Sequence, residues 1–129
     1  MNAWCRLAWT LLAVYCLLLV IATHVPAATL EQLPVELNDK LAHFVAYAGL
    51  GFLLAMAFQL THKVWWWTIG MTISVGFAFA GLDEWTQQFV RRHADWVDVA
   101  ADACGILIGL ALFLAASAVH HLRTIRTQT

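Results

Sequence analysis

The sequence predicts an all-α, polytopic membrane protein that folds as a bundle of four transmembrane helices. Hydrophobic residues make up 62% of the 129 residues and charged residues 12%, whereas soluble domains have about 45–50% and about 25%. These apolar residues gather in four runs, each long enough for the roughly 20 residues with which a helix crosses a bilayer. The links between the runs are short, so we expect a single domain over residues 1–129.

The composition also excludes other classes of protein. A soluble chain of this size cannot bury so much apolar surface. The formal net charge of −1 gives no bulk attraction to a polyanion, so we expect a lipid bilayer and no nucleic acid as the partner.

The first apolar run covers about residues 4–23. Arg6 near its start and the small residues 25–28 after it also resemble a cleavable signal peptide. The apolar core is longer than the usual core of such a peptide and fits a full membrane span. We therefore expect residues 1–28 to remain in the mature protein.

The other three runs cover about residues 41–60, 64–86 and 97–119. Small residues on one helix face allow close helix contact. We expect such packing at five glycines: Gly105 and Gly109 in the fourth run, and Gly70, Gly76 and Gly81 in the third.

Three cysteines, Cys5, Cys16 and Cys104, lie within the apolar runs and lack metal-site spacing. An odd number in such places does not indicate a disulfide framework. We expect them to be small buried hydrophobic side chains.

The charges indicate how the helices are oriented. The two ends of the chain and the turn at residues 61–63 carry four basic residues and no acid, whereas the opposite side carries three basic residues and all eight acids. Because cytoplasmic segments are enriched in Lys and Arg, we expect both termini in the cytoplasm. We expect tryptophans to form interfacial belts on the two sides: Trp4, Trp65, Trp66 and Trp67 on the inner side, and Trp85 and Trp96 on the outer side.

Polar residues recur at helical spacing near the outer ends of three helices. An ionisable residue within a membrane segment costs about 2.5–3.5 kcal/mol on insertion scales. Residues three or four apart share a helix face, so we expect these stripes to face one another at one depth. The three stripes are Asp39, His43 and Tyr47; Glu84, Gln87 and Arg91; and Asp95, Asp98 and Asp102.

Several chemistries remain open for these stripes. His43 with Asp39 one turn earlier matches an acid/base pair. The carboxylates can share protons or hold a divalent cation through oxygen ligands. The arginines can bind a phosphate or a carboxylate. The sequence has no HExxH, Walker loop or GxGxxG motif to select one reaction.

A structural network of ion pairs is the alternative, in which Lys40, Arg91 and Arg92 neutralise several acids. Helix packing needs only one or two polar contacts, so we favour a functional site. Its candidate catalytic residues are His43, Asp39, Glu84 and Asp98. Its candidate binding residues are Lys40, Tyr47, Asp83, Gln87, Arg91, Arg92, Asp95 and Asp102. The inner helix halves offer few polar residues, which argues against a channel.

Two blocks of the chain resemble motifs of VanZ-like membrane proteins, and the resemblance covers nearly the whole chain. The first block is Asp39-Lys40-x-x-His43-Phe44-x-x-Tyr47-x-x-Leu50-Gly51-Phe52. The second is Asp83-Glu84-x-x-Gln87-x-Phe89-Val90, followed by Arg92-x-x-Asp95-Trp96-x-Asp98-Val99-x-x-Asp102-x-x-Gly105-x-x-x-Gly109. The family usually has a Pro-Gly pair before its arginine. This chain lacks that pair, and we align Arg92 with the arginine by its spacing to Asp95 and Asp98.

The resemblance implies a multi-pass protein of the bacterial cytoplasmic (inner) membrane with a role in the cell envelope. The founding member of the family is associated with teicoplanin resistance. We expect the polar site to act on or bind an envelope component, such as a lipid head group or a lipid-linked precursor. The alternative is a non-enzymatic binder of a lipid, an ion or an antibiotic, or a small partner or scaffold subunit. Because both hypotheses stand, the sequence does not decide whether the protein is an enzyme.

Overall fold

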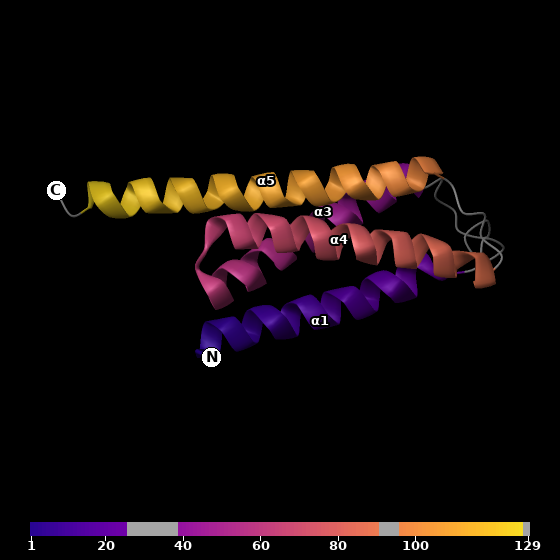
Figure 1. Cartoon of the computed structure of the whole chain (residues 1–129), viewed down its shortest axis with the longest axis horizontal. Coiled ribbons are helices and arrows are strands. Elements are labelled where there is room, and N and C mark those ends of the chain that lie inside the picture. The colour runs from indigo at the N-terminus through magenta and orange to yellow at the C-terminus, as the bar shows by residue number, and fades with distance from the viewer. Residues whose placement is uncertain (26–38, 91–95, 128–129) are drawn as a thin grey trace, which may run out of the picture.

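The computed structural model describes residues 1–25, 39–90 and 96–127 (Figure 1). The described elements are α1 (Ala3–Thr23), α3 (Asp39–His62), α4 (Trp65–Gln87), the short 3₁₀ helix η1 (Gln88–Val90) and α5 (Trp96–Arg126). The four α-helices are each long and apolar enough to cross a membrane. The predicted all-α bundle of four transmembrane helices is therefore confirmed, and the protein is a multi-pass membrane protein.

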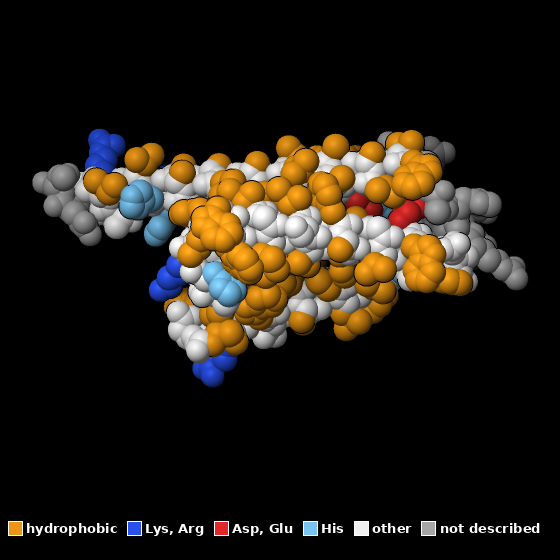
Figure 2. Space-filling model, in the orientation of Figure 1, with side chains coloured by type: hydrophobic (Ala, Val, Ile, Leu, Met, Phe, Trp, Pro, Cys, Tyr) orange, Lys and Arg blue, Asp and Glu red, His pale blue; other side chains and the backbone are white. Residues whose placement is uncertain are grey.

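The helices lie side by side and bring both ends of the described chain to one end of the bundle (Figure 1). The turn between α3 and α4 lies there too. We call this the basic end, because it carries Arg6, Lys63, Arg123 and Arg126. The opposite end, the acidic end, carries every described acidic residue: Asp39, Asp83, Glu84, Asp98 and Asp102. In Figure 2, red side chains emerge between α4 and α5 near the acidic end, and the blue side chains lie at the opposite end.

Three of the helices begin and end within two residues of the expected positions, whereas α5 continues seven residues beyond residue 119. Residues 120–126 contain no glycine or proline, the two residues that most disfavour a helix interior. At 31 residues, α5 reaches past the ends of its neighbours at the basic end (Figure 1).

Helix α3 is the centre of the bundle and packs against α1, α4 and α5. Its contact with α5 is very close: a side chain at Gly105 would overlap the carbonyl oxygen of Phe44, and one at Gly109 would overlap that of Ala48. Gly51 approaches the backbone of α5 in the same way. The predicted packing face of Gly105 and Gly109 is confirmed, and it holds together the halves of α3 and α5 nearer the acidic end.

Of the other three glycines predicted to pack against a helix, one does so and two do not. Gly76 packs on the side chain of Ile106, with 3.0 Å between an added Cβ and the nearest atom. Gly70 and Gly81 face open space, so the packing prediction was wrong for them within this chain. They lie on the side of α4 that turns away from the other helices.

All three cysteines are free, which confirms the prediction that they form no disulfide framework. Cys5 is buried and Cys16 is half-buried, but Cys104 is exposed. The prediction of burial was wrong for Cys104 because its position on α5 faces outward, where a membrane protein presents apolar side chains to lipid.

Candidate functional site

The acidic end contains a buried group of polar side chains to which all four long helices contribute. Nine polar or charged side chains are buried in the described part of the chain, and seven of them lie at this end. The remaining two, Thr68 and Thr72, lie in the other half of α4. These seven residues and the buried Tyr47 together form what we call the polar cluster. Its eight members are Thr23, His43, Tyr47, Asp83, Glu84, Gln87, Asp98 and Asp102.

Asp83 accepts three hydrogen bonds from other described members of the polar cluster. Its Oδ1 accepts a hydrogen bond of 2.9 Å from the Thr23 hydroxyl. Its Oδ2 accepts one of 2.9 Å from the Tyr47 hydroxyl and one of 3.1 Å from Nε2 of Gln87. Both carboxylate oxygens are thus occupied, and Asp83 links α1, α3 and α4.

His43 and Asp102 form a buried pair between α3 and α5. Nδ1 of His43 lies 2.9 Å from Oδ1 of Asp102, and the two residues are 4% and 0% exposed. A neutral imidazole that donates from Nδ1 leaves Nε2 as an acceptor. The second oxygen of Asp102, Oδ2, is buried and has no hydrogen-bond partner within the described residues. Asp102 therefore differs from Asp83, whose oxygens are both bonded.

The sequence pattern suggested Asp39 as the partner of His43, but the carboxylate that hydrogen-bonds the ring comes from α5. Asp39 is the first residue of α3 and is exposed. The imidazole instead points into the α3–α5 interface, where the small Gly105 lets the backbones approach closely. Asp102 lies one helical turn before Gly105 and meets His43 there.

Lys40 and Asp98 form an ion pair at the margin of the polar cluster, with Nζ and Oδ1 2.9 Å apart. The lysine side chain is half-exposed, whereas the aspartate is largely buried. This pair also joins α3 to α5 and places a cation where the polar cluster approaches the bundle surface.

Three members of the polar cluster are arranged as metal ligands would be. His43, Glu84 and Asp102 each offer one nitrogen or oxygen atom, and these atoms lie within 4.8 Å of one another. Each residue comes from a different helix and all three are buried.

The structure thus brings together eight of the twelve sequence-predicted site residues and exposes a ninth, Asp39, at the start of α3. The eight are Lys40, His43, Tyr47, Asp83, Glu84, Gln87, Asp98 and Asp102. The other three, Arg91, Arg92 and Asp95, lie outside the described residues.

Sequence reasoning missed the contribution of α1. Thr23 donates to Asp83, and Nε2 of His24 lies 3.0 Å from the hydroxyl oxygen of Thr86. His24 lies just outside the predicted apolar run of residues 4–23, and in the structure it is the C-cap of α1. The signal that could have found these residues was their place in the sequence. They lie at the end of the first apolar run, and that end of the helix lies at the same end of the bundle as the acids.

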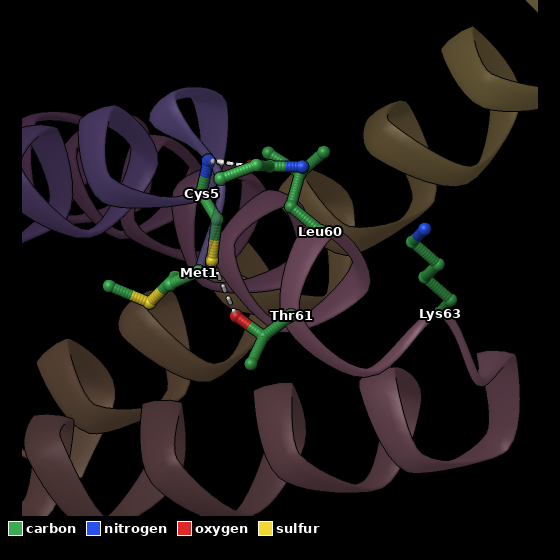
Figure 3. Close-up of a pocket in the computed structure, with 6 residues that line it drawn as sticks. Met1, Cys5, Leu60, Thr61 and Lys63 are labelled. Carbon is green, nitrogen blue, oxygen red and sulfur yellow. Dashed lines mark hydrogen bonds between the residues drawn. The ribbon is translucent and has the colours of Figure 1, made fainter.

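The basic end has a different character. A hollow there is lined by Met1, Asn2, Cys5, Leu60, Thr61 and Lys63 (Figure 3). Cys5 Sγ lies 3.2 Å from Oγ1 of Thr61, which also accepts a hydrogen bond from the Trp9 ring. These groups join α1 to α3, and none of the described residues that line the hollow is acidic. We therefore place the candidate site at the acidic end.

The order of these residues along the chain matches a known family. The model of the VanZ/LLP1 family matches residues 14–117. The chain belongs to the VanZ/LLP1 family. The range that matches the VanZ/LLP1 model includes the whole polar cluster and the glycines between α3 and α5.

An uncharacterized protein of the fission yeast Schizosaccharomyces pombe is also similar to this VanZ/LLP1 chain. It is 32% identical over 114 residues, which are 87% of this chain and 65% of the relative. The chain thus spans 65% of the length of that relative. No solved structure matches the chain.

Proposed function

We propose that this VanZ/LLP1 protein binds the polar head group of a lipid or of a lipid-linked envelope molecule at its acidic end, and acts on it there. The observation that supports this most is the location of the buried polar side chains. Seven of the nine in the described residues lie at one end of the bundle. Burying this many polar groups is costly, and helix packing in a bilayer requires far fewer.

The rest of the core supports a site that is reached from one membrane surface. Below the polar cluster the buried side chains are mainly apolar, such as Leu50, Leu54, Phe58 and Ile106. Thr68 and Thr72 are the buried polar exceptions among the described residues. A transport pathway would need polar groups along the whole bundle, so a one-sided site fits better.

His43 is suited to the chemical step. Asp102 holds one ring nitrogen, and a histidine oriented by a carboxylate can take or give a proton at its other nitrogen. Lys40 at the margin can attract an anionic group such as a phosphate. We assign Arg92 the same role, by its place in the family motif.

We further propose that the acidic end faces the extracytoplasmic surface of a bacterial cytoplasmic membrane and that both termini are cytoplasmic. The basic residues gathered at the other end favour this orientation.

Lipid analysis of a strain that lacks the gene tests this function. We expect one lipid or lipid-linked class to change in covalent structure, and to be restored by the wild type and by Lys63→Gln, a variant at the basic end. The His43→Gln variant should fail to restore it. Native mass spectrometry of the purified protein should show a lipid class that His43→Gln binds less.

Two results define the alternatives. An unchanged lipid composition together with selective lipid binding would make the protein a non-enzymatic binder. No selective lipid binding, with full complementation by His43→Gln, would contradict a head-group site.

A further inference from the structure

Three residues of the polar cluster, His43, Glu84 and Asp102, converge on one point between three helices. They are 4%, 5% and 0% exposed and come from α3, α4 and α5. One ligand atom from each lies within 4.8 Å of the other two. Asp83, Gln87 and Thr23 link α1, α3 and α4 at this level through hydrogen bonds of their own, in which Glu84 and Asp102 take no part.

A second observation indicates that something binds between them. Oδ2 of Asp102 is buried and has no hydrogen-bond partner among the described residues. A buried carboxylate oxygen without a donor or a cation is costly, because it loses its hydration without compensation. Asp83, in the same polar cluster, has donors on both oxygens, so the bundle is able to supply them where no ligand is needed.

We propose that His43, Glu84 and Asp102 bind a divalent transition-metal ion, with Zn²⁺ or Mn²⁺ as the fitting ions. Two carboxylates balance the charge of a divalent cation, which reduces the cost of burying each charge within a membrane helix bundle. The imidazole nitrogen distinguishes this set from the all-oxygen sites of Ca²⁺ and Mg²⁺. Three protein ligands leave a position for water or a substrate oxygen, as in catalytic zinc sites.

The spacing of the three residues is compatible with such a site. Ligand atoms of a tetrahedral zinc ion lie about 3.3 Å apart, given metal–ligand distances of about 2.0–2.1 Å. The atoms of the three side chains lie within 4.8 Å of one another, so small side-chain rotations bring them to the ion. The close α3–α5 backbone contact at Gly105 fixes the positions of two of the ligands.

This inference deepens the proposed function, on which it rests only for the identity of the molecule that meets the ion. It replaces proton transfer by His43 with activation of the head group by the ion, because a ring nitrogen that binds a metal cannot also carry a proton. Without a cation, the carboxylates of the polar cluster would repel an anionic phosphate head group. A divalent ion neutralises the two carboxylates that hold it and can polarise a phosphoryl or carbonyl oxygen. The metal therefore explains how an acidic site can receive an anionic lipid.

Metal analysis of the full-length protein tests the site without reference to activity. Purified protein in detergent is stripped with a chelator, dialysed separately against Zn²⁺, Mn²⁺ and Mg²⁺, and analysed by inductively coupled plasma mass spectrometry. We expect one equivalent of Zn²⁺ or Mn²⁺ per chain and weaker binding of Mg²⁺. His43→Gln, Glu84→Gln and Asp102→Asn should each weaken binding about tenfold or more, since even supporting residues around metal sites change affinity by about 10–100-fold.

The matched control is His120→Gln, a histidine that is exposed near the end of α5. This variant should keep the metal. X-ray absorption of the zinc-loaded wild type, which needs no variant to fold, should show one imidazole with oxygen ligands. No bound equivalent, a shell of several histidines, or unchanged affinity in Asp102→Asn would overturn the proposal.

The metal measurements and the lipid-binding measurements distinguish a failure of the metal site from a failure of the proposed function. Stoichiometric metal with no lipid selectivity would leave the metal site standing and contradict the head-group function. Selective lipid binding that survives chelation, in a protein that binds no metal, would do the reverse.

Discussion

The hydroxyl group of Tyr47 donates a 2.9 Å hydrogen bond to Oδ2 of Asp83, and both side chains are buried between α3 and α4. Thr23 and Gln87 complete the bonding of the same carboxylate. Two neighbouring acids of the polar cluster therefore have different surroundings. Asp83 is enclosed by donors, whereas Asp102 keeps one oxygen without a hydrogen-bond partner in the described part of the chain.

Replacing Tyr47 with phenylalanine should destabilise the bundle without changing its shape. The change removes a buried donor from Asp83, and we expect the free energy of unfolding to fall by about 0.5–2 kcal/mol, since polar contacts between membrane helices are often at the lower end. Unfolding in detergent, followed by circular dichroism, measures this. Thr124→Val, at an exposed position of α5, should leave the value unchanged; equal effects of the two changes would contradict the role of Tyr47.

A glycine in the α3–α5 contact, Gly109, and a glycine that faces open space, Gly70, provide a matched test of that contact. Gly109→Leu should disrupt the bundle, because a side chain there overlaps the carbonyl oxygen of Ala48 and overpacking forces backbone shifts. Gly70→Leu adds the same side chain where it meets open space and should be tolerated. Size-exclusion chromatography in detergent should show loss of the folded species for Gly109→Leu only. Similar behaviour of both variants would mean that the contact is not as close as the structure shows.

Labelling of single cysteines should report the orientation of the bundle. In a background without the native cysteines, Lys63→Cys and Thr127→Cys should react with a membrane-impermeant maleimide from the cytoplasmic side. Gln88→Cys, next to the acidic end and exposed, should react from the other side. Labelling of Lys63→Cys and Thr127→Cys from opposite sides would contradict the helix arrangement, and labelling of both from outside would reverse the proposed orientation.

Helix α1 should remain part of the mature protein. It contacts α3, and its Thr23 side chain bonds Asp83, so a cleaved chain would lose one donor of the polar cluster. The intact mass of the purified protein should therefore include residues 1–28. A mass lower by that segment would show that the signal-peptide interpretation was right.

Hydropathy was sufficient to predict the four helices. A segment that crosses a bilayer as a helix satisfies its own backbone hydrogen bonds, so its length and apolar composition are enough to identify it. The small residues Gly105 and Gly109 correctly indicated the closest contact. Helical spacing indicated which faces of α3, α4 and α5 were polar. It did not show which polar side chains would pair, so Asp39 was expected beside His43 where Asp102 lies.

The features that the sequence did not predict depend on how each helix is rotated about its own axis relative to its neighbours. The sequence of a single helix does not determine that rotation. The outward position of Gly70, Gly81 and Cys104 follows from that rotation. So does the difference between Asp83 and Asp102, which look equivalent as acids at the outer ends of two apolar runs. The contribution of Thr23 was missed for the same reason, since α1 offers no polar stripe of its own.

The most direct test of the account compares Asp83→Asn with Asp102→Asn, measuring unfolding in detergent and lipid binding by native mass spectrometry on the same samples. We predict that Asp83→Asn lowers the free energy of unfolding by about 1–3 kcal/mol, because it disturbs a fully bonded buried carboxylate. In metal-free protein, Asp102→Asn should leave the free energy of unfolding equal or higher, since it removes a buried charge. The variant should nevertheless lose selective head-group binding. If Asp102→Asn destabilises the protein as Asp83→Asn does and the remaining folded protein binds lipid normally, the polar cluster is a structural network and the claim of a functional site is wrong.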